Sequence, residues 1–544
     1  MKRILSNATL PPPKRLHTLA GAAAPLFQLT FENALSEELI LLIFSHLSWV
    51  DLCNAQRVSQ NWHRIAKDQS LWKSLFITTF GRSRLRGAKG FTGRTDGRDM
   101  RPMPGRAQPS TEAKDWRSMF RISFRWKTGR CTTEHIEGIL KPHKRPTPKP
   151  PHVLLAGSTT IIASSEDSSN PEIHCLQSSG SPKQILRCGS PRHPHSCHIT
   201  AIALDQSPPT ITGTLRLAVF LSTGEFLVFS VHPSNPSSTI RLFSYIPARQ
   251  VAIVRQSVYH HPLLVSLSEA FVIALYDLSS ESVRHTQSLS SYSTFPPSSM
   301  ILSTQTPGSR SMVYKLVLTY SVPIFPLHYS LGVTELLISC SASHVSNSTS
   351  SSTPFSFESP SEMSVISTRT TRALDVPQGW IDQEKLQAMK DQWGRKVLHI
   401  QDTRSDGKWV VLAPGEGRTS APSVTDAESL SPYTLSGNSG GSLQLYRLFL
   451  PPVTSVASPP PKLAFTRYLY HTVGTVTSMS IADGRCVTLG KTMVCIWDLE
   501  SGTSAEVALP ESMCNGEPEQ GTVAFDDRRI ITARGGTVLV HRFD

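Results

Sequence analysis

Residues 34–81 read ALSEELILLIFSHLSWVDLCNAQRVSQNWHRIAKDQSLWKSLFITTFG and decide the architecture of the N-terminal part. Four apolar residues recur there at every fourth position: Leu35, Leu39, Ile43 and Leu47. This spacing places them on one face of a helix. Ile40 and Phe44 form a second apolar row beside the first. A helix that is apolar on nearly all sides must be buried on nearly all sides.

The start of this helix carries the usual signals. Ser36 is the candidate N-cap, and Glu37 and Glu38 place negative charge in the first turn, where the helix dipole favours it. Three more short helices are expected before Gly81, with candidate N-caps at Asp51, at Ser59, and at Asp68 or Ser70. Helices this small can cover one side of the first helix only, so we expect a second polypeptide to hold the other side in a groove.

The spacing of these positions resembles the F-box motif, whose pattern reads LPxELxxxIFxxL, followed by dL, VS, W and LW. The matching positions are Leu35, Glu38, Leu39, Ile43, Phe44, Leu47, Asp51, Leu52, Val58, Ser59, Trp62, Leu71 and Trp72. One position departs from the pattern, because Ser36 stands where the motif has proline. The alternative is an ordinary helical core segment, which would make both tryptophans and both spacings accidental.

The resemblance implies a partner for this module. F-box modules dock onto a Skp-type adaptor, which connects to a cullin. The residues expected to make the contact are Leu35, Leu39, Ile43, Leu47, Leu52, Val58 and Trp62. Some of these side chains must instead form the module's own core, and the sequence does not divide them between the two roles.

The charge of the chain is unevenly distributed. Its 544 residues carry 54 Lys and Arg against 41 Asp and Glu, a formal net charge of +13. Essentially all of the excess lies between Lys2 and Lys149, outside the part that reads as β-rich. A basic excess can attract nucleic acid, an acidic membrane or an acidic ligand, but the β-rich part is close to neutral and offers no bulk attraction to an anion.

The cysteines give no support for a zinc site, because the 9 thiols are scattered without a C-x-x-C pair. Five potential ligands lie close together: Cys188, His193, His195, Cys197 and His198. A proline-containing loop explains them as well, and we expect no metal and no other cofactor. An odd, unpatterned set of cysteines suits a reducing compartment, so the expected location is the cytoplasm and/or the nucleus.

Residues 1–30 are expected to form a disordered basic tail. Lys2-Arg3 and Lys14-Arg15 could form a weak nuclear-import signal. The first 25 residues lack the apolar core of a secretory signal, and no run in the chain approaches the roughly 18 apolar residues of a membrane helix. We therefore expect no membrane partner.

Residues 31–80 are assigned to the F-box and residues 81–110 to a flexible Arg/Gly loop. The loop has too little apolar content to pack a core. Arg/Gly segments can bind RNA through phosphates, but among the residues 81–105 only Phe91 offers an aromatic ring for stacking. The sequence therefore favours a solvated loop and argues against a nucleic-acid partner.

Residues 111–130 are expected to form a linker helix. Trp116, Phe120 and Phe124 share one face, and basic residues fill the other sides. F-box proteins with propellers carry a similar aromatic-basic helix before the propeller, and FRWKTG at 124–129 resembles its end. Residues 131–152, which include KPHKRPTPKPPH, are expected to form a stiff Pro/Lys linker.

From residue 153 to residue 544, short apolar runs alternate with Gly, Ser, Pro and Asp turns, which is typical of strands joined in hairpins. The runs in 474–502 end in IWDL followed by SG, and this pattern resembles a WD-type repeat. Residues 521–543 repeat it once more. Such units, with four strands in about 40 to 50 residues, indicate propeller blades, and the span has room for roughly seven. The alternative is a pair of β-sandwiches or a barrel.

Two insertions are expected within the propeller. Residues 341–372 are rich in Ser and Thr and are expected to form a disordered loop. Residues 382–395 are expected to form a short amphipathic helix with Leu386, Met389 and Trp393 facing inward.

The expected fold is α plus all-β, with a small helical F-box followed by a β-propeller of about seven blades. No catalytic pattern stands out: GNSGG at 437–441 matches G-x-S-x-G in letters but leads into a strand, which favours a hairpin turn. We therefore expect no enzyme activity of the chain itself. Four arginines near strand ends read as ordinary surface residues, so no substrate-binding residue is nominated: Arg404, Arg485, Arg528 and Arg534.

By resemblance, an F-box followed by a propeller implies the substrate receptor of an SCF-type cullin–RING ubiquitin ligase. Such a receptor docks to a Skp-type adaptor and, through it, to a cullin. Its propeller holds a protein substrate, phosphorylated or not, for ubiquitination and proteasomal degradation. The alternative is a propeller scaffold or RNA-associated protein that uses the F-box-like module in a different complex, which the Arg/Gly loop and the basic charge would suit.

Overall fold

The chain divides into two compact units, Met1–Ile77 and Thr78–Asp544. The computed structural model describes residues 31–81, 115–140, 149–177, 184–190, 196–207, 214–232, 239–248, 251–280, 282–292, 294–305, 312–324, 327–340, 363–375, 379–415, 442–451, 459–470, 474–514 and 520–544. The predicted tail 1–30, nearly all of the Arg/Gly loop 81–110 and the GNSGG segment lie outside the described residues.

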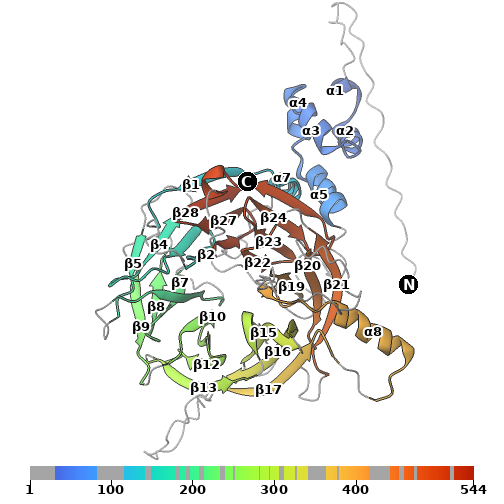
Figure 1. Cartoon of the computed structure of the whole chain (residues 1–544). Coiled ribbons are helices and arrows are strands. Elements are labelled where there is room, and N and C mark those ends of the chain that lie inside the picture. Colours follow the sequence, from blue (N-terminus) through green and yellow to red (C-terminus); the bar gives the residue numbers. More distant parts are fainter. Residues whose placement is uncertain are drawn as a thin grey trace, which may run out of the picture. The chain divides into compact units, whose positions relative to one another are not determined.

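Short helices make up the described part of the first unit. They are α1 Phe31–Ala34, α2 Glu37–Phe44, α3 Trp49–Ala55, α4 Gln60–Ile65 and α5 Gln69–Phe76, followed by the short π-helix η1 Ile77–Gly81 (Figure 1). Two predicted caps are confirmed: the Ser59 hydroxyl accepts from the Trp62 N–H at 3.1 Å, and the Asp68 carboxylate accepts from the Ser70 N–H at 2.7 Å.

The predicted starts of two helices need correction. At α3 the cap is Ser48, whose hydroxyl accepts from the Asp51 N–H at 3.3 Å. The helix therefore begins at Trp49, and Asp51 lies in its first turn, where the helix dipole favours its charge. At α2, Ser36 precedes the helix but its side chain makes no capping hydrogen bond.

The second unit is a seven-bladed β-propeller, with four antiparallel strands in each blade (Figure 1). Blades 1 to 4 are β2 His152–Ala156, β3 Thr159–Ala163, β4 Glu172–Gln177, β5 Gln184–Arg187; β6 Ile199–Leu204, β7 Leu215–Leu221, β8 Phe226–Val231, β9 Ile240–Tyr245; β10 Val254–His260, β11 Leu263–Ser268, β12 Val272–Asp277, β13 Arg284–Ser290; and β14 Phe295–Gln305, β15 Met312–Ile324, β16 His328–Cys340, β17 Met363–Arg372.

Blades 5 to 7 complete the ring. Their strands are β18 Ile400–Ser405, β19 Trp409–Pro414, β20 Ser442–Phe449, β21 Lys462–Tyr470; β22 Ser478–Ala482, β23 Arg485–Leu489, β24 Met493–Asp498, β25 Ser504–Ala508; and β26 Thr522–Phe525, β27 Arg529–Arg534, β28 Thr537–Arg542 with β1 Thr132–Ile136. The first strand of each blade contacts the first strand of the next, and β26 contacts β2, so the ring of inner strands is closed.

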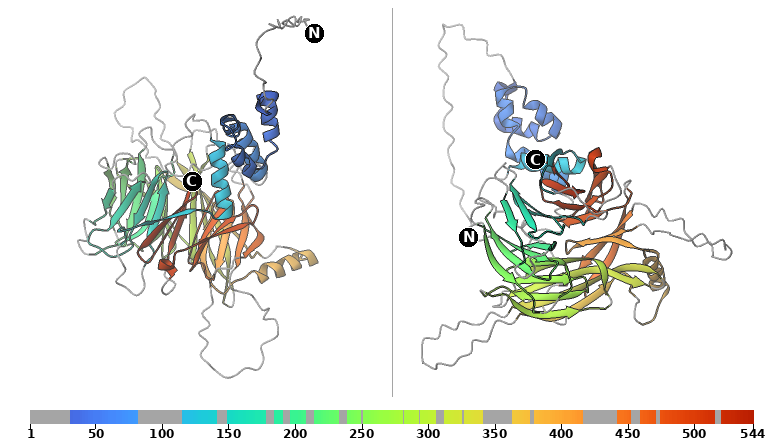
Figure 2. Two further views of the ribbon diagram at one scale, coloured as in Figure 1. Left: turned by 90° about the horizontal axis from the view of Figure 1, so that it is seen from above. Right: turned by 60° about the vertical axis from the view of Figure 1, so that its left-hand side comes forward.

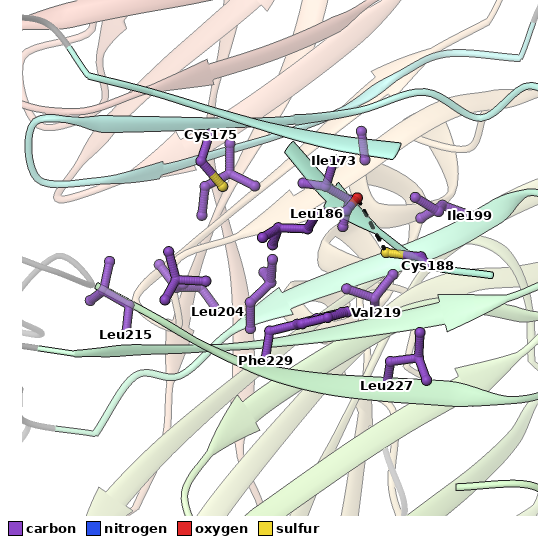
Figure 3. Close-up of a cluster of buried hydrophobic side chains, with 14 of the residues drawn as sticks. Ile173, Cys175, Leu186, Cys188, Ile199, Leu204, Leu215, Val219, Leu227 and Phe229 are labelled. Carbon is purple, nitrogen blue, oxygen red and sulfur yellow. Dashed lines mark hydrogen bonds between the residues drawn. The ribbon is translucent and has the colours of Figure 1, made fainter. Parts of the chain in front are cut away.

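Apolar cores fill the spaces between neighbouring blades. Figure 3 shows the core between blades 1 and 2, where Ile173 and Leu186 meet Val219 and Phe229. Cys188 belongs to the same core, and its burial raises the pKa of its thiol to about 12. Because each sheet lies between two neighbouring blades, strands such as β3 and β11 are buried on both faces, which explains the short apolar runs of the sequence.

The predicted linker 131–152 differs from the structure in its first part. Residues 132–136 form β1, which pairs with β28 as the outer strand of blade 7. Four of the five residues of β1 are exposed, because an outer strand covers little of the core. The segment TTEHI is therefore polar, and its strand character lies in β-branched residues rather than in an apolar pattern.

The predicted loop 341–372 also needs correction. Residues 341–362 lie outside the described residues, but Met363–Arg372 forms β17, the outer strand of blade 4. Its side chains alternate between partly covered and exposed, and Ser and Thr occupy many of these positions. A polar outer strand reads as a loop when composition alone is considered.

Blade 4 contains buried charges. Lys315 of β15 lies with its Nζ 2.8 Å from one Glu335 carboxylate oxygen, and Arg369 of β17 lies 3.8 Å from the other. Lys315 also donates to the carbonyl oxygen of Pro451, which follows β20, at 3.0 Å. This cluster therefore joins blade 4 to blade 5 as well as its own strands to one another.

The linker helix α7 Trp116–Thr128 packs on the propeller through Trp126. The Trp126 ring stacks on Phe543 with a centroid separation of 4.3 Å, and its Nε1 donates to the carbonyl oxygen of Asp527 at 2.9 Å. The Arg485 guanidinium lies 4.7 Å above the ring. Gly129 ends the helix at a φ of +68°, where a Cβ would lie 2.5 Å from the Glu506 carbonyl oxygen, so only glycine fits.

The insertion helix is α8 Gln383–Gly394, and none of its residues is buried. Leu386 and Trp393 are exposed and Met389 is half-buried, so the prediction that these side chains face inward is wrong. A further short helix, α9 Glu511–Cys514, lies between blades 6 and 7. Among the described residues no helix is long and apolar enough to cross a lipid bilayer.

We predict that Trp126→Ala lowers the free energy of unfolding of the propeller by about 3 to 5 kcal/mol, because it removes a buried indole together with its stacking and hydrogen bond. Chemical denaturation of the full chain measures the change. The control is Trp380→Ala, since Trp380 is 85% exposed and should cost at most about 0.5 kcal/mol. Equal effects of the two substitutions would contradict the packing role of Trp126.

A second prediction concerns His541 of β28, which is fully buried and lies 3.0 Å from the Thr133 hydroxyl of β1. Burial lowers the pKa of His541 to about 4. The unfolded chain binds the proton of this histidine more tightly than the folded chain does. The contribution of neutral His541 to the free energy of unfolding is therefore fully present above a pH of about 6.5 and is lost as the pH drops towards 4. Between pH 7 and pH 5 this residue should cost about 2 kcal/mol.

Thermal unfolding at pH 7, 6 and 5 measures this loss. His541→Asn should flatten the pH dependence by about that amount, whereas His135→Asn, which changes an exposed histidine of β1, should leave it as in the wild type. An unchanged slope in His541→Asn would show that this histidine does not couple protonation to closure of blade 7.

Candidate functional site

The candidate site lies on the helices of the first unit. On α2, Ile40 and Phe44 are buried, whereas Leu39 and Ile43 are exposed. Leu42 is 59% exposed, although it lies on a helix that is almost entirely apolar. The helix therefore has two apolar sides, of which its own unit covers one.

The covered side packs on aromatic residues from the other helices. The Trp62 ring of α4 meets the edge of Phe44 at a centroid separation of 5.2 Å and that of Phe31 at 5.5 Å. Trp72 of α5 is buried, and its Nε1 donates to the carbonyl oxygen of Ala66 at 2.8 Å. The core of the unit is thus complete without the exposed side of α2.

A two-pronged ion pair fixes α2 against α4. Both terminal nitrogens of Arg64 donate to the two carboxylate oxygens of Glu37, each at 2.7 Å. The hydrogen bond from Arg64 holds the pKa of Glu37 below its usual value. Arg64 also donates to the Asn61 side chain at 3.0 Å, so the guanidinium is held in one orientation.

The structure divides the seven predicted docking residues into three groups. Leu39, Ile43 and Val58 are exposed, and Val58 is 63% exposed in the segment between α3 and α4. Leu35, Leu47 and Trp62 are half-buried. Leu52 is fully buried, so its side chain serves the internal core.

Three large apolar residues exposed in the first unit were not among the predicted docking residues: Leu42, Val50 and Phe31 of α1, whose ring packs on Trp62. Leu42 of α2 and Val50 of α3 expose large parts of their side chains. The sequence did contain a signal for Leu42, because it lies three residues after Leu39 and one before Ile43, on the same side of a helix. Val50 has no such signal, because its orientation depends on α3 starting at Trp49 rather than after Asp51.

Three of the four propeller arginines considered in the sequence make contacts within the fold, whereas the fourth, Arg528, is exposed as predicted. Arg534 donates to the carbonyl oxygens of Gly490 and Lys491 at 2.7 and 2.9 Å, and so joins blade 7 to blade 6. Arg485 lies over Trp126, and Arg404 donates to Asp402 at 3.2 Å. These contacts occupy the guanidinium groups and favour structural roles. Arg534 is buried, so the prediction that it is an ordinary surface residue is wrong.

The Cys/His cluster of the sequence does not form a metal site in the part of the chain that the structure describes. Cys188 and Cys197 are buried, and burial raises the pKa of both thiols. His198 lies with Nδ1 2.7 Å from Asp167 and Nε2 2.8 Å from the Lys149 ammonium. His193 and His195 lie outside the described residues, within which no group of three potential ligands is found.

Comparison with known proteins agrees with this geometry. Residues 37–78 match the F-box-like family. "Probable E3 ubiquitin ligase complex SCF subunit sconB" of Arthroderma otae is 28% identical over 149 residues, 23% of this chain and 22% of that protein. An F-box protein of Saccharomyces cerevisiae is 24% identical over 155 residues, 25% of this chain and 23% of that protein. The chain spans less than a quarter of the length of these relatives.

Among solved structures, the β-propeller domain of Myceliophteria thermophila Cps50 (Swd1) aligns with 76% of this chain and 99% of its own, at 10% identity and a TM-score of 0.39. The propeller assignment therefore rests on the strand pairing described above. The chain combines an F-box-like domain near its N-terminus with a seven-bladed β-propeller.

We predict that Leu52→Ala and Leu39→Asp differ sharply in their cost to the first unit. Leu52→Ala should lower its unfolding free energy by about 2 to 5 kcal/mol, because it opens a cavity. Leu39→Asp places a charge in solvent and should change it by at most about 0.5 kcal/mol. Hydrogen exchange of the α2 to α5 amides in the full chain measures both values. A large loss in Leu39→Asp would mean that this side chain serves the internal core.

Proposed function

We propose that this chain is the substrate-recognition subunit of an SCF-type cullin–RING ubiquitin ligase. In this proposal the F-box-like domain docks to a Skp-type adaptor and, through it, to the cullin, while the propeller binds a protein substrate. The result is ubiquitination of the substrate and its degradation by the proteasome. The names of the two relatives, an SCF ligase subunit and an F-box protein, support this reading.

One observation carries the proposal. Leu39, Leu42 and Ile43 stand exposed on α2 at the spacing by which an amphipathic helix fills a groove. A unit whose core is already complete does not need these side chains, and exposed apolar side chains gathered on one helix mark an interaction site. Val50 and Val58 extend the apolar set to the neighbouring segments.

The proposed contribution to ubiquitin transfer is proximity. A receptor that holds a substrate lysine near the loaded conjugating enzyme converts an encounter in solution into a reaction at high effective concentration. The chemistry then belongs to the partners, and we propose no catalytic step for this chain. The eight cysteines whose side chains are described are free thiols, which supports action in the cytoplasm and/or the nucleus.

The alternative, a scaffold or RNA-associated protein, has less support. It depended on the Arg/Gly segment, which lies almost entirely outside the described residues, and on the basic charge. The family match and the named relatives both favour the receptor.

We predict that Leu39→Glu combined with Ile43→Glu abolishes co-purification of the adaptor and cullin with the full chain, because two carboxylates would be buried in an apolar groove. The control pair, Gln60→Glu with Thr79→Glu, adds the same charge at exposed positions outside α2 and should leave co-purification intact. Recovery of RNA that falls steeply with salt and is unaffected by either pair would favour the alternative.

A further inference from the structure

The helix α8 belongs to the insertion between β17 and β18 and extends from the ring (Figures 1 and 2). Its C-terminal end is anchored: the Gln392 side chain accepts from the Asp375 N–H at 3.2 Å, and Gln444 of blade 5 donates to the Arg395 carbonyl oxygen at 2.8 Å. None of its 12 residues is buried, and only Met389 and Gln392 are half-buried, so little of the helix is covered.

One side of α8 carries an apolar stripe that is only partly covered. Leu386, Met389 and Trp393 follow the spacing i, i+3, i+7 and so share one face. Leu386 is 45% and Trp393 42% exposed. An isolated helix of about 12 residues is only marginally stable in water, and this one gains little stability from burial, because large parts of Leu386 and Trp393 stay exposed. A surface that covers the stripe would therefore stabilise the helix and the contact together.

The charges around the stripe indicate the chemistry of that surface. At 100° per residue, Lys385 and Lys390 lie at the two borders of the stripe, whereas Glu384 and Asp391 lie on the opposite side of the helix. Lys396 continues the basic border, with its ammonium 4.2 Å above the Trp393 ring. The Lys385 ammonium also lies 3.7 Å from Asp382, and both side chains are about half exposed.

We propose that α8 is a docking helix whose stripe enters an apolar groove bordered by carboxylates on a partner protein. Charge complementarity identifies the partner, because the lysines at the borders of the stripe would face the rim of the groove. A membrane surface fits less well, since interfacial helices present a broader apolar face than three side chains over two turns.

The position of α8 in the propeller separates this contact from the linker helix. The insertion precedes β18, the first strand of blade 5, whereas Trp126 of α7 is held by Asp527 in the turn that follows β26, the first strand of blade 7. First strands run in the same direction around the channel, so the two helices belong to opposite faces of the ring. The contact goes beyond the proposed adaptor docking and does not depend on it.

The first measurement needs no partner. Hydrogen exchange of the full chain should show weak protection for the α8 amides and strong protection for β18, because only the strand is supported by packing. Protection of α8 equal to that of β18 would overturn the proposal, since a helix that is stable alone needs no covering surface.

The second measurement identifies and tests the partner. The full chain, with a photoreactive aromatic residue in place of Met389, is cross-linked in its own cells, and the protein in the adduct is then produced alone. Its Kd for the unlabelled chain should rise about tenfold or more with Leu386→Asp or Trp393→Asp. Lys385→Glu with Lys390→Glu should also weaken binding and reduce its dependence on salt.

The matched control is Ala388→Asp, which introduces the same charge on an exposed part of α8 away from the stripe and should change the Kd less than about twofold. Leu39→Glu with Ile43→Glu should leave this Kd unchanged, so failure of adaptor docking would not affect the result. The proposal is overturned by equal effects of Leu386→Asp and Ala388→Asp, by an adduct with a second copy of the chain, or by stripe-dependent binding to phosphatidylcholine–phosphatidylserine vesicles.

Discussion

Closure of the ring is the constraint on which the second unit depends. Seven sheets arranged around a channel bury their faces only if the last blade is completed, and here the fourth strand of that blade is β1, which precedes all the others in the chain. The buried His541 lies at the seam between the two segments. Arg529 strengthens the closure by donating to the Gly157 carbonyl oxygen of blade 1 at 2.7 Å.

Similar contacts tie other neighbouring blades at the same face. The Asp205 carboxylate accepts from the His261 N–H at 2.9 Å, and the Asp406 carboxylate accepts from the Gly484 N–H at 3.1 Å. Each contact joins the turn between the first two strands of one blade to the corresponding turn of the next. Carboxylates of this kind hold backbone groups that would otherwise stay unpaired, and so fix the angle between blades.

The sequence predicted those parts of the structure in which apolar residues carry the pattern. The apolar second and third strands of the blades, the caps at Ser59 and Asp68 and the aromatic helix before the propeller follow from spacing and resemblance. The outer strands β1 and β17 were missed because they are polar, and their pairing partners lie far away in the chain or across a long insertion. The sequence could not predict which face of the apolar helix α2 is exposed, because Leu39 and Ile40 belong to two apolar rows that look alike in sequence. The packing of Phe44 on Trp62 turns the row of Ile40 into the core and leaves Leu39 exposed.

The pairing of Thr133 with His541 joins residues that are 408 positions apart. During synthesis on the ribosome, β1 therefore emerges early, but its pairing strand β28 is available only after nearly the whole propeller has been translated. Folds with such long-range pairing form slowly and leave strand edges open to aggregation in the meantime. The polar sequence of β1 lowers the risk of aggregation while the strand is unpaired. Four of its five residues are exposed even in the folded protein, and a polar strand edge pairs poorly with strands of other chains.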